Sequence, residues 1–269
     1  MKLSDRFRVK PGSKVTLARR DPDDTADLAD KKAAKKRMQK NLERLAELQY
    51  RLYAESKRSV LVVLQALDAG GKDGTIRHVM GPLNPQSCKV VSFKAPTDEE
   101  LAHDFLWRIH RHAPRHGEIR IFNRSHYEDV LIVRVHNLVP KSVWSKRYEQ
   151  INAFEKILAQ NHTHILKFYL HISKDEQRQR FQARLDDPTK HWKASEADFA
   201  ERKFWNAYVK AYEAALSRCS TDDAPWFIIP ANKKWFRNYA ISEILVDTLA
   251  KLRMKFPAPK ADIANIKLD

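Results

Sequence analysis

Residues 60–76 read VLVVLQALDAGGKDGTI, and this stretch decides the fold that the sequence predicts. Its first half is an unbroken apolar run rich in Val and Leu, as expected of a parallel strand that is buried on both faces. The glycine-rich segment 69–75, AGGKDGT, follows directly after Asp68, and a helix is predicted from Thr75. A strand, a glycine loop with one lysine and a helix start form a cradle for phosphate, because glycines let backbone N–H groups face phosphate oxygens.

The loop departs from the P-loop pattern G-x-x-x-x-G-K-[ST] at two positions. Ala66 stands in place of the first glycine, and Asp73 stands in place of the hydroxyl residue that binds magnesium. Asp68 and Asp73 bracket the loop and fit as Mg²⁺ ligands, since this ion needs only one or two carboxylates in addition to phosphate oxygens. The alternative is an ordinary strand-to-helix turn whose glycines serve the geometry and whose lysine is solvated.

Composition and charge limit the classes of protein to which the chain can belong. The 269-residue chain is 43% hydrophobic, which is enough for a substantial core and predicts one large α/β domain. Lys and Arg outnumber Asp and Glu by 50 to 34, so the formal net charge is +16. Such an excess favours a polyanionic partner. The alternatives are nucleic acid, an anionic membrane surface and a long phosphate chain.

Other features of the composition point to a cellular compartment. Cys88 and Cys219 lie far apart and outside any metal-ligand spacing, which favours a reducing compartment. The 11 histidines form no H-E-x-x-H or similar pattern, so no zinc site is expected. Residues 1–14 lack the apolar core of a signal peptide, and no stretch approaches the length of a membrane span. We therefore expect a soluble cytoplasmic protein without a membrane partner.

The rest of the chain alternates predicted strands with predicted helices. Residues 1–30 are polar and predict an extended arm on the surface, whereas residues 31–55 predict an amphipathic helix. Further strands are predicted at 89–93, 117–122, 165–172 and 226–230. Further helices are predicted from Thr97 to before Pro114, from Pro140 through 158, and over 173–185, 196–218 and 235–255, with capping boxes at Thr97/Glu100 and Ser173/Glu176.

This alternation predicts a three-layer α/β/α fold with a five-stranded parallel sheet. Ligands bind at the carboxyl ends of the strands in such sheets. Polar clusters follow the predicted strands directly, at 68–72, at 123–129, from 173 onward and at 231–233. Their location at one edge of the sheet favours a binding site over a plain turn.

The residues at this edge suit phosphoryl transfer, which needs donor and acceptor oxygens in line and their charge neutralised by Mg²⁺, Lys and Arg. Lys72 would bridge phosphates, Asp68 would hold a metal ion or its waters, and Arg124 would reach the transferring group. Glu128 is the candidate for a second carboxylate on the metal or for orienting the acceptor. The alternative for Arg124 is an internal salt bridge with Glu128 or Asp129.

A charged helix follows the fourth predicted strand. Its Arg180 and Arg184 lie four residues apart and so share one face. Nucleotide kinases use such a helix as a lid whose arginines clamp phosphates on closure. The alternative is a surface helix with exchangeable charge pairs, because Asp175 and Glu176 are also present.

Taken together, four segments resemble the polyphosphate kinase 2 family, and within it the subgroup often called class III. They are LDAGGKDGTIR (67–77), FNRSHYEDVL (122–131), SKDEQRQRFQARLDDPTKHWK (173–193) and PAN (230–232). The similarity extends from DPDD at 21–24 through PANKKWFRN at 230–238. It implies a P-loop kinase core with a helical lid, similar to thymidylate kinases, and Mg²⁺-dependent, reversible transfer of a terminal phosphoryl group between inorganic polyphosphate and a nucleotide.

The resemblance also implies roles for individual residues. The Walker A residues correspond to Asp68, Lys72 and Asp73, the Walker B segment to Asn123, Arg124 and Glu128, and the lid arginines to Arg180 and Arg184. The expected catalytic residues are Asp68, Lys72, Arg124 and Glu128. The expected phosphate contacts are Gly70, Gly71, Lys72, Asp73, Gly74, Thr75, Arg77, Arg180, Arg184 and Lys193. The expected nucleotide contacts are Asn123, Arg124, Tyr127 and Glu128, and the expected ligands for Mg²⁺, or alternatively Mn²⁺, are Asp68, Asp73 and Glu128.

One departure from the family pattern bears on the substrate. Many members have aspartate at the position of Asn123, followed by RSWYNR, whereas this chain continues with RSHYED. That form resembles the subgroup that accepts AMP as well as ADP, and it leaves Glu128 or Asp129 to take the role of the missing carboxylate. The expected substrates are inorganic polyphosphate, AMP, ADP and ATP. The positive charge then has a reason, because polyphosphate carries a charge on each phosphate as nucleic acid does.

Two other functions stay open, an ATP-dependent nucleotide kinase and a basic nucleic-acid-binding P-loop protein. The carboxylates at the strand ends argue against the second, since they would repel a polyanion without a metal, and we expect no nucleic-acid partner. We expect an N-terminal arm and helix over 1–55 that pack on the core, a P-loop kinase domain over 56–256 with its lid at about 173–195, and a C-terminal tail over 257–269. We also expect a homo-oligomer, either a dimer or a tetramer.

Overall fold

The computed structural model describes residues 1–259 apart from 29, 194 and 195. Its centre is a five-stranded parallel sheet with the strand order β2-β3-β1-β4-β5. The strands are β1 (Ser59–Gln65), β2 (Cys88–Ser92), β3 (Ile119–Asn123), β4 (Thr163–His171) and β5 (Trp226–Pro230). The predicted α/β fold is therefore confirmed, and each predicted strand is present close to its expected position.

Helices and short turns connect the strands. The α-helices are α1 (Leu3–Phe7), α2 (Lys31–Glu55), α3 (Lys72–Thr75), α4 (Asp98–Leu101), α5 (Trp107–His110), α6 (Ile132–Val135), α7 (Lys141–Trp144), α8 (Arg147–Gln160), α9 (Lys174–Leu185), α10 (Glu196–Glu201), α11 (Trp205–Arg218) and α12 (Lys234–Lys251). The tighter or wider turns are η1 (Leu17–Arg19), the π turn η2 (Ile76–Met80), η3 (His126–Val130), η4 (Pro188–Lys193) and η5 (Arg202–Phe204).

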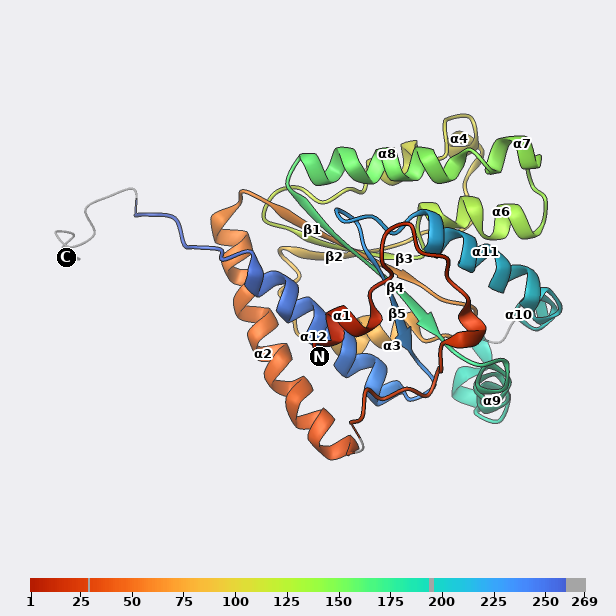
Figure 1. Ribbon diagram of the computed structural model, residues 1–269, viewed down its shortest axis with the longest axis horizontal. Coiled ribbons are helices and arrows are strands. Elements are labelled where there is room, and N and C mark those ends of the chain that lie inside the picture. The colour runs from red at the N-terminus through yellow and green to blue at the C-terminus, as the bar shows by residue number, and fades with distance from the viewer. Residues whose placement is uncertain (29, 194–195, 260–269) are drawn as a thin grey trace.

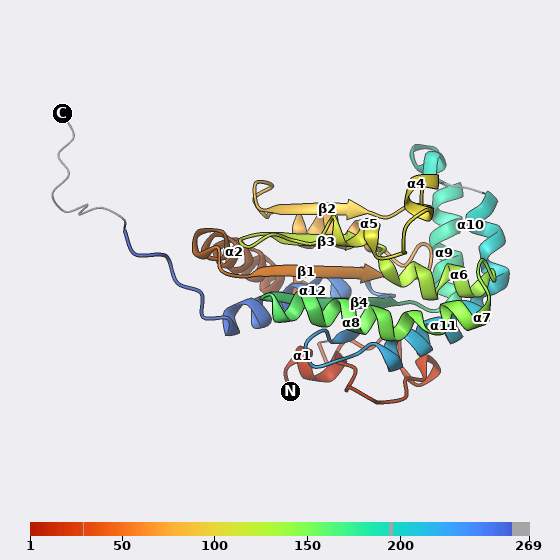
Figure 2. The same cartoon turned by 90° about the horizontal axis from the view of Figure 1, so that it is seen from above.

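Helices cover both faces of the sheet, as Figures 1 and 2 show. Strand β1 is central, and all of its residues are buried. Val62 and Leu64 belong to the core beneath α2 and α12, whereas Leu61 and Val63 belong to the core beneath α8 and α11. Successive side chains of a strand point to opposite faces, so a strand covered on both faces needs predominantly apolar residues. This requirement explains the unbroken apolar run in the sequence.

Three of the predicted long helices are interrupted. The helix after Thr97 is divided into α4 and α5, the helix after Pro140 into α7 and α8, and the helix over 196–218 into α10, η5 and α11. The last helix, α12, ends at Lys251 and not at 255. Helical periodicity continues across each of these breaks, so the pattern could not reveal where the chain bends to follow the core.

The two predicted capping boxes have different outcomes. Thr97 accepts a hydrogen bond from the N–H of Glu100 (3.2 Å), and the Glu100 carboxylate accepts one from the N–H of Thr97 (2.9 Å), which confirms the first box. Ser173 caps α9 by accepting from the N–H of Glu176 (3.1 Å). The Glu176 carboxylate, however, pairs with Arg180 (2.7 Å), so the reciprocal bond of the second box is replaced by an ion pair.

The N-terminal segment is packed more deeply than the predicted surface arm. It forms α1, and Phe7, Val9, Val15 and Leu17 are buried. The N–H of Val9 donates to the carbonyl oxygen of Trp226 (2.8 Å), so the arm runs beside β5 and covers that edge of the sheet. Apolar residues of the arm that are spaced without a regular period thus still find partners at the sheet edge.

Helix α2 has the predicted bounds. Asp30 caps it by accepting from the N–H groups of Lys32 and Ala33, and its apolar face, which includes Leu45 and Leu52, is buried against the core. Neither α2 nor any other helix in the described part of the chain combines the length and apolar character needed to cross a bilayer.

Candidate active site

The glycine loop joins the carboxyl end of β1 to α3. Its backbone enters the left-handed region at Ala69 (φ 59°) and at Gly71 (φ 105°). A Cβ atom added at Gly71 would lie 1.9 Å from Nη1 of Arg237, so this position needs glycine both for its backbone and for its neighbour. The loop thus forms the tight strand-to-helix turn that a phosphate cradle requires.

Protein donors hold the carbonyl oxygens of this loop. Nε2 of Gln177 donates to the carbonyl of Asp68 (2.9 Å), and Nη1 of Arg180 donates to the carbonyls of Ala69 (2.9 Å) and Gly70 (3.0 Å). Because these carbonyls are occupied, a phosphate would bind through N–H groups of the loop other than that of Gly70, which donates to the carbonyl of Leu67 (2.9 Å).

Lys72 is the lysine of the loop, and the other charged residues predicted for this edge surround it. Burial lowers the pKa of Lys72, and the positive charge of Arg124 lowers it further. The carboxylates of Asp68, Glu128 and Asp73 act in the opposite direction. The structure therefore brings these four side chains close enough to Lys72 to influence its protonation, and an anionic ligand would favour the charged lysine in the same way.

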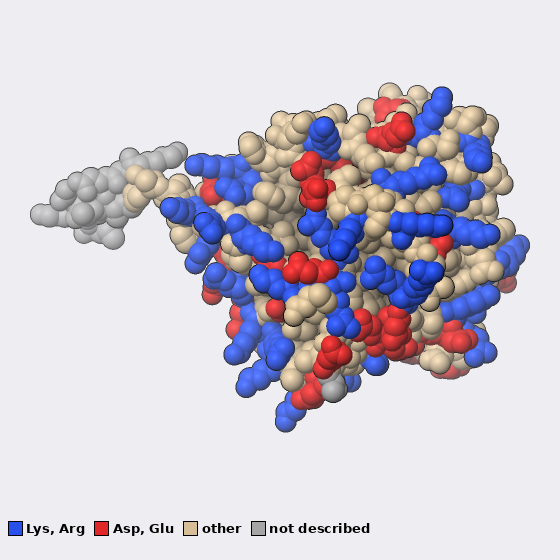
Figure 3. All heavy atoms as spheres, viewed as in Figure 1, with Lys and Arg blue, Asp and Glu red and all other residues tan. Residues whose placement is uncertain are grey.

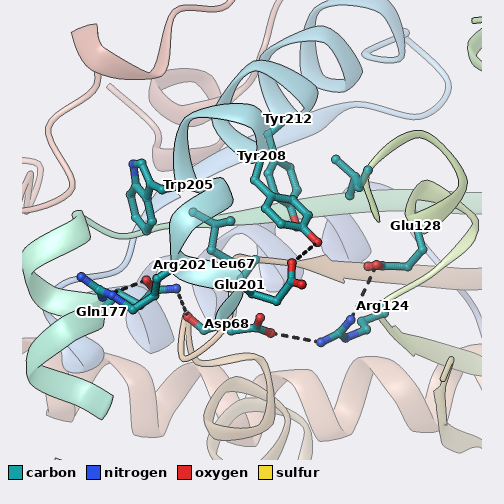
Figure 4. Close-up of a pocket in the computed structure, with 12 residues that line it drawn as sticks. Leu67, Asp68, Arg124, Glu128, Gln177, Glu201, Arg202, Trp205, Tyr208 and Tyr212 are labelled. Carbon is teal, nitrogen blue, oxygen red and sulfur yellow. Dashed lines mark hydrogen bonds and ion pairs between the residues drawn. The ribbon is translucent and has the colours of Figure 1, made fainter. Parts of the chain in front are cut away.

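Arg124 follows β3 and lies between two carboxylates. Its backbone is left-handed (φ 62°), which is uncommon outside glycine and recurs at functional sites. Nη2 lies 3.1 Å from Oδ1 of Asp68, and Nη1 lies 3.6 Å from Oε2 of Glu128 (Figure 4). Burial acts to lower the pKa of Arg124, but Glu128 and Asp68 outweigh it and the pKa is raised. With 40% of its side chain exposed, Arg124 can still reach a ligand.

Glu128 is held on both oxygens. Gln65 is buried at the end of β1, and with its amide nitrogen turned toward Glu128 it donates to Oε1 at 3.1 Å. Asp129 instead pairs with Arg147 (Oδ1 to Nη1, 2.8 Å), and burial raises its pKa to about 6. The expected internal salt bridge of Arg124 is therefore formed with Glu128 and not with Asp129, and Glu128 is the carboxylate positioned at the site.

The three predicted metal ligands are not assembled into one cluster. Arg124 separates Asp68 from Glu128, and Asp73 accepts a hydrogen bond from Nδ2 of Asn123 (3.0 Å). Within the residues that the structure describes, no group of three or more His, Cys, Asp and Glu side chains is arranged to hold a metal ion. Asp68 and Asp73 still flank the glycine loop, which suits Mg²⁺ because that ion takes one or two carboxylates, phosphate oxygens and several waters.

A pocket opens beside Asp68, Arg124 and Glu128. Its walls include residues that the sequence analysis missed: Glu201, Arg202, Trp205, Tyr208 and Tyr212 (Figure 4). The hydroxyl of Tyr208 donates to Glu201 (2.8 Å) at its centre. The three aromatic residues are spaced by three and four along one helix face, and this spacing was the available signal.

Two predicted contact residues use their hydroxyl groups inside the protein. Tyr127 is fully buried, its hydroxyl donates to Glu155 (2.9 Å), and Nζ of Lys167 donates to the same hydroxyl (2.8 Å). Thr75 is also fully buried, and its Oγ1 donates to the carbonyl of Gly71 (3.2 Å). Both hydroxyl groups are therefore engaged within the protein in this structure, and the nucleotide contact by Tyr127 and the phosphate contact by Thr75 stay predictions.

Arg180 is a structural brace and not the free lid arginine that we expected. Its guanidinium is 8% exposed and is engaged on every side. Nε pairs with Glu176, Nη1 donates to two carbonyls of the glycine loop, and Nη2 donates to the carbonyls of Ala231 and Asn232. It could bind polyphosphate only after losing some of these bonds, and its phosphate contact stays a prediction.

The other residues predicted to contact phosphate differ in their exposure and in their neighbours. Arg184 lies 3.8 Å from Asp198 and keeps 23% of its side chain exposed. Arg77 is exposed on η2, and Gly74 borders the guanidinium of Arg237. Lys193 ends η4, but its side chain is outside the described part of the structure.

Arg237 is a buried cation behind the glycine loop that the sequence analysis missed, although it lies within the quoted segment 230–238. It is 2% exposed and donates to Oδ1 of Asn238 from Nε (3.0 Å) and Nη2 (2.8 Å). Burial, together with the nearby charge of Arg180, lowers the pKa of Arg237 to about 10. Two guanidinium groups thus support the loop from behind, and this positive charge favours an anion on its open side.

A glycine loop at the carboxyl edge of a parallel sheet, beside a lysine and an arginine, defines the class of protein. It is a P-loop phosphotransferase with an α/β core.

Comparison with known proteins identifies the family. The family model for polyphosphate kinase 2 matches residues 28–257, and the chain belongs to that family. The chain is 54% identical over 265 residues to the AMP/ADP-polyphosphate phosphotransferase of Meiothermus ruber, and the matched region covers 98% of this chain and 99% of that protein. It is 46% identical over 263 residues to the ADP-polyphosphate phosphotransferase of Rhodopseudomonas palustris, covering 93% and 91% of the two chains.

A solved structure agrees with this assignment. The crystal structure of polyphosphate kinase 2 from Arthrobacter aurescens TC1 superposes with a TM-score of 0.95 at 44% identity, over 98% of this chain and 94% of that one. The resemblance read from the four sequence segments is therefore confirmed, and so is the predicted P-loop kinase fold.

Proposed function

We propose that this polyphosphate kinase transfers the terminal phosphoryl group of inorganic polyphosphate to AMP and to ADP, reversibly, and so makes ADP and ATP. The observation that carries the proposal is the position of Arg124 between Asp68 and Glu128, directly beside the glycine loop and its Lys72. The names of the two relatives, an AMP/ADP-polyphosphate and an ADP-polyphosphate phosphotransferase, support the choice of substrates.

In the proposed reaction the glycine loop holds the donor. An oxygen of the acceptor's terminal phosphate bonds to the terminal phosphorus of polyphosphate, the bridging P–O bond breaks, and polyphosphate leaves one phosphate shorter. Lys72 and Arg124 neutralise the charge on the transferring group, while Asp68 and Glu128 orient the Arg124 guanidinium between them. No covalent intermediate on the protein is needed, so positioning and charge supply the catalysis.

The same carboxylates suit a divalent ion. Asp68 and Asp73 would hold Mg²⁺, with Glu128 as a further carboxylate and Mn²⁺ as an alternative ion. A bound Mg²⁺ would neutralise phosphate charge and fix the orientation of its oxygens.

We assign the acceptor nucleotide to the pocket beside Arg124. Trp205 and Tyr208 offer aromatic faces on which a base can stack, and Glu201 and Arg202 offer polar groups for a sugar or a phosphate. Asn123 and Glu128 stay the residues predicted to determine whether both AMP and ADP are accepted. Trp205→Ala should raise KM for AMP and ADP while KM for polyphosphate stays unchanged, and an equal rise in both KM values would contradict the assignment.

The charge of the whole molecule supports a polyanionic donor. Figure 3 shows Lys and Arg spread over the displayed face, with acidic side chains between them. We expect KM for polyphosphate to rise steeply with salt, because binding releases counterions. Homo-oligomer formation and a cytoplasmic location stay predictions.

The test offers AMP and ADP separately to the purified protein with Mg²⁺ and polyphosphate. Product nucleotides are measured by chromatography, and ATP also by luminescence. Product from both acceptors supports the proposal, whereas product from ADP alone removes AMP from it. No product with polyphosphate, together with transfer from ATP to AMP, would favour the ATP-dependent nucleotide kinase. A Lys72→Met variant should be inactive, and full activity in that variant would rule out the assigned cradle.

A further inference from the structure

Residues 21–24, DPDD, are used by no step of the proposed reaction. In the structure this segment lies against the loop after β5, at the same edge of the sheet as the active site. Oδ1 of Asp21 accepts a hydrogen bond from the N–H of Asp23 (2.9 Å), with Pro22 between them, which makes a tight local turn. This turn presents the Pro22 carbonyl and the Asp23 carboxylate to Asn232.

Asn232 is the point where three elements meet. Its N–H donates to the carbonyl of Pro22 (3.2 Å), and its Nδ2 donates to Oδ2 of Asp23 (2.8 Å). Its Oδ1 accepts from the N–H of Ser173 (3.0 Å), the residue that caps α9. One side chain therefore connects the N-terminal arm, the start of α9 and the loop that leads into α12.

Arg180 links this point to the glycine loop. Its Nη2 donates to the carbonyls of Ala231 and Asn232, and its Nη1 donates to the carbonyls of Ala69 and Gly70. Arg180 is largely buried, so a carbonyl that moved away would leave a poorly solvated guanidinium group without its partner. A shift of residues 231–232 must therefore move Arg180, and with it the loop carbonyls that determine where the N–H groups point.

We propose that Asn232 is a positioning residue for phosphoryl transfer, which sets the glycine loop through Arg180, and that Pro22 and Asp23 of the N-terminal arm hold Asn232 in place. This inference rests on the proposed function. It gives the arm a role in donor binding, because the glycine loop is the part of the site assigned to polyphosphate.

The direction in which the use of polyphosphate changes when Asp23 is replaced distinguishes a positioning role from a simple effect of charge. Asp23 is an exposed carboxylate near a site for a polyanion, so charge alone predicts that its removal improves the use of polyphosphate. Positioning predicts a loss, because Nδ2 of Asn232 loses the Asp23 carboxylate and keeps only the longer hydrogen bond to Oγ of Ser173 (3.3 Å).

The experiment compares Asp23→Ala with Asp23→Asn, since the asparagine keeps an oxygen that can accept from Nδ2 of Asn232. Asp27→Asn is the matched control, because Asp27 is another arm carboxylate, 93% exposed, that pairs with Arg6 and not with Asn232. The kinetics are measured with polyphosphate varied at saturating AMP and with AMP varied at saturating polyphosphate. The thermal midpoint of unfolding is recorded for every variant.

Asp23→Ala should lower kcat/KM for polyphosphate by about two- to tenfold, which corresponds to one net hydrogen bond. KM for AMP should stay unchanged, and Asp23→Asn and Asp27→Asn should keep the wild-type values. Asn232→Ala should lower kcat/KM for polyphosphate further. If the Asn232→Ala variant does not fold, the comparison of Asp23→Ala with Asp23→Asn tests the proposal.

Several results would overturn the proposal. They are wild-type kinetics or improved use of polyphosphate in Asp23→Ala, an equal loss in Asp23→Asn, and a lower midpoint of unfolding without any change in kcat/KM. If the wild-type protein used no polyphosphate at all, the proposed function would fail, and this inference with it.

Discussion

Gly71→Ala tests the contact between the glycine loop and the buried arginine behind it. The change adds a methyl group where φ is +105° and where the new Cβ would lie 1.9 Å from Nη1 of Arg237. A left-handed backbone costs an L residue about 1–2 kcal/mol, and the reduced freedom of the unfolded chain offsets about 0.4–1 kcal/mol of this. The clash adds about 1–3 kcal/mol, as overpacking usually does, because Arg237 is buried and held by Asn238. The free energy of unfolding should therefore fall by about 3 kcal/mol.

Gly12→Ala is the matched control. Gly12 also has a left-handed backbone (φ +71°), but nothing lies within 4 Å of the position of its missing Cβ. It carries the backbone cost alone, so its free energy of unfolding should fall by about 1 kcal/mol or less. Both variants are measured by urea unfolding and by ATP formation from ADP and polyphosphate. Gly71→Ala should lose most of its activity while Gly12→Ala keeps it. Equal losses of stability, or full activity in Gly71→Ala, would refute the reasoning.

Three further predictions concern charged groups. Asp68→Asn should lower kcat at least about a hundredfold, as expected when a group that organises charge at the reacting phosphate is removed, with an unchanged midpoint of unfolding. A wild-type kcat would exclude Asp68 from the proposed metal site. Lys167→Met removes the cation that pairs with the buried carboxylate of Glu155, which keeps its hydrogen bonds to Tyr127 and His126. The change should cost about 3–5 kcal/mol in urea unfolding, because both side chains of the ion pair are at most 1% exposed. A small loss would mean that Glu155 finds another partner or a proton. Burial raises the pKa of Asp129 from 3.8 to about 6, so its contribution to stability is present below about pH 4 and is lost as the pH rises through about 6. Asp129→Asn should flatten this part of the stability profile, and an unchanged slope in urea titrations from pH 4 to 7 would contradict the assignment.

Local patterns were sufficient to predict the sheet and the edge that carries the site. A strand covered on both faces is predominantly apolar, so β1 could be read from its composition. Parallel strands end at one edge, so the residues after β1 and β3 could be expected to meet there. Asp68, Lys72, Arg124 and Glu128 do so, and no contact had to be known in advance.

Local patterns could not predict which polar side chains face a ligand and which support the protein. Arg180 shares its helix face with Arg184 and so looked like a second lid arginine. Its partners are carbonyls 110 and 111 residues away in the glycine loop and 51 and 52 residues away after β5. Tyr127 lies in the most informative motif, yet it faces Glu155 on α8 and Lys167 on β4.

The amino-acid sequence thus determined the elements, their order and the chemical character of one edge, because periodicity and turn chemistry act over a few residues. Tertiary structure decided the partner of each polar group, since buried donors and acceptors must be paired with whatever the packing of distant segments brings near. Packing placed Arg237 behind the glycine loop, assembled the aromatic pocket of Trp205 and Tyr208, and brought Asp23 of the arm to Asn232.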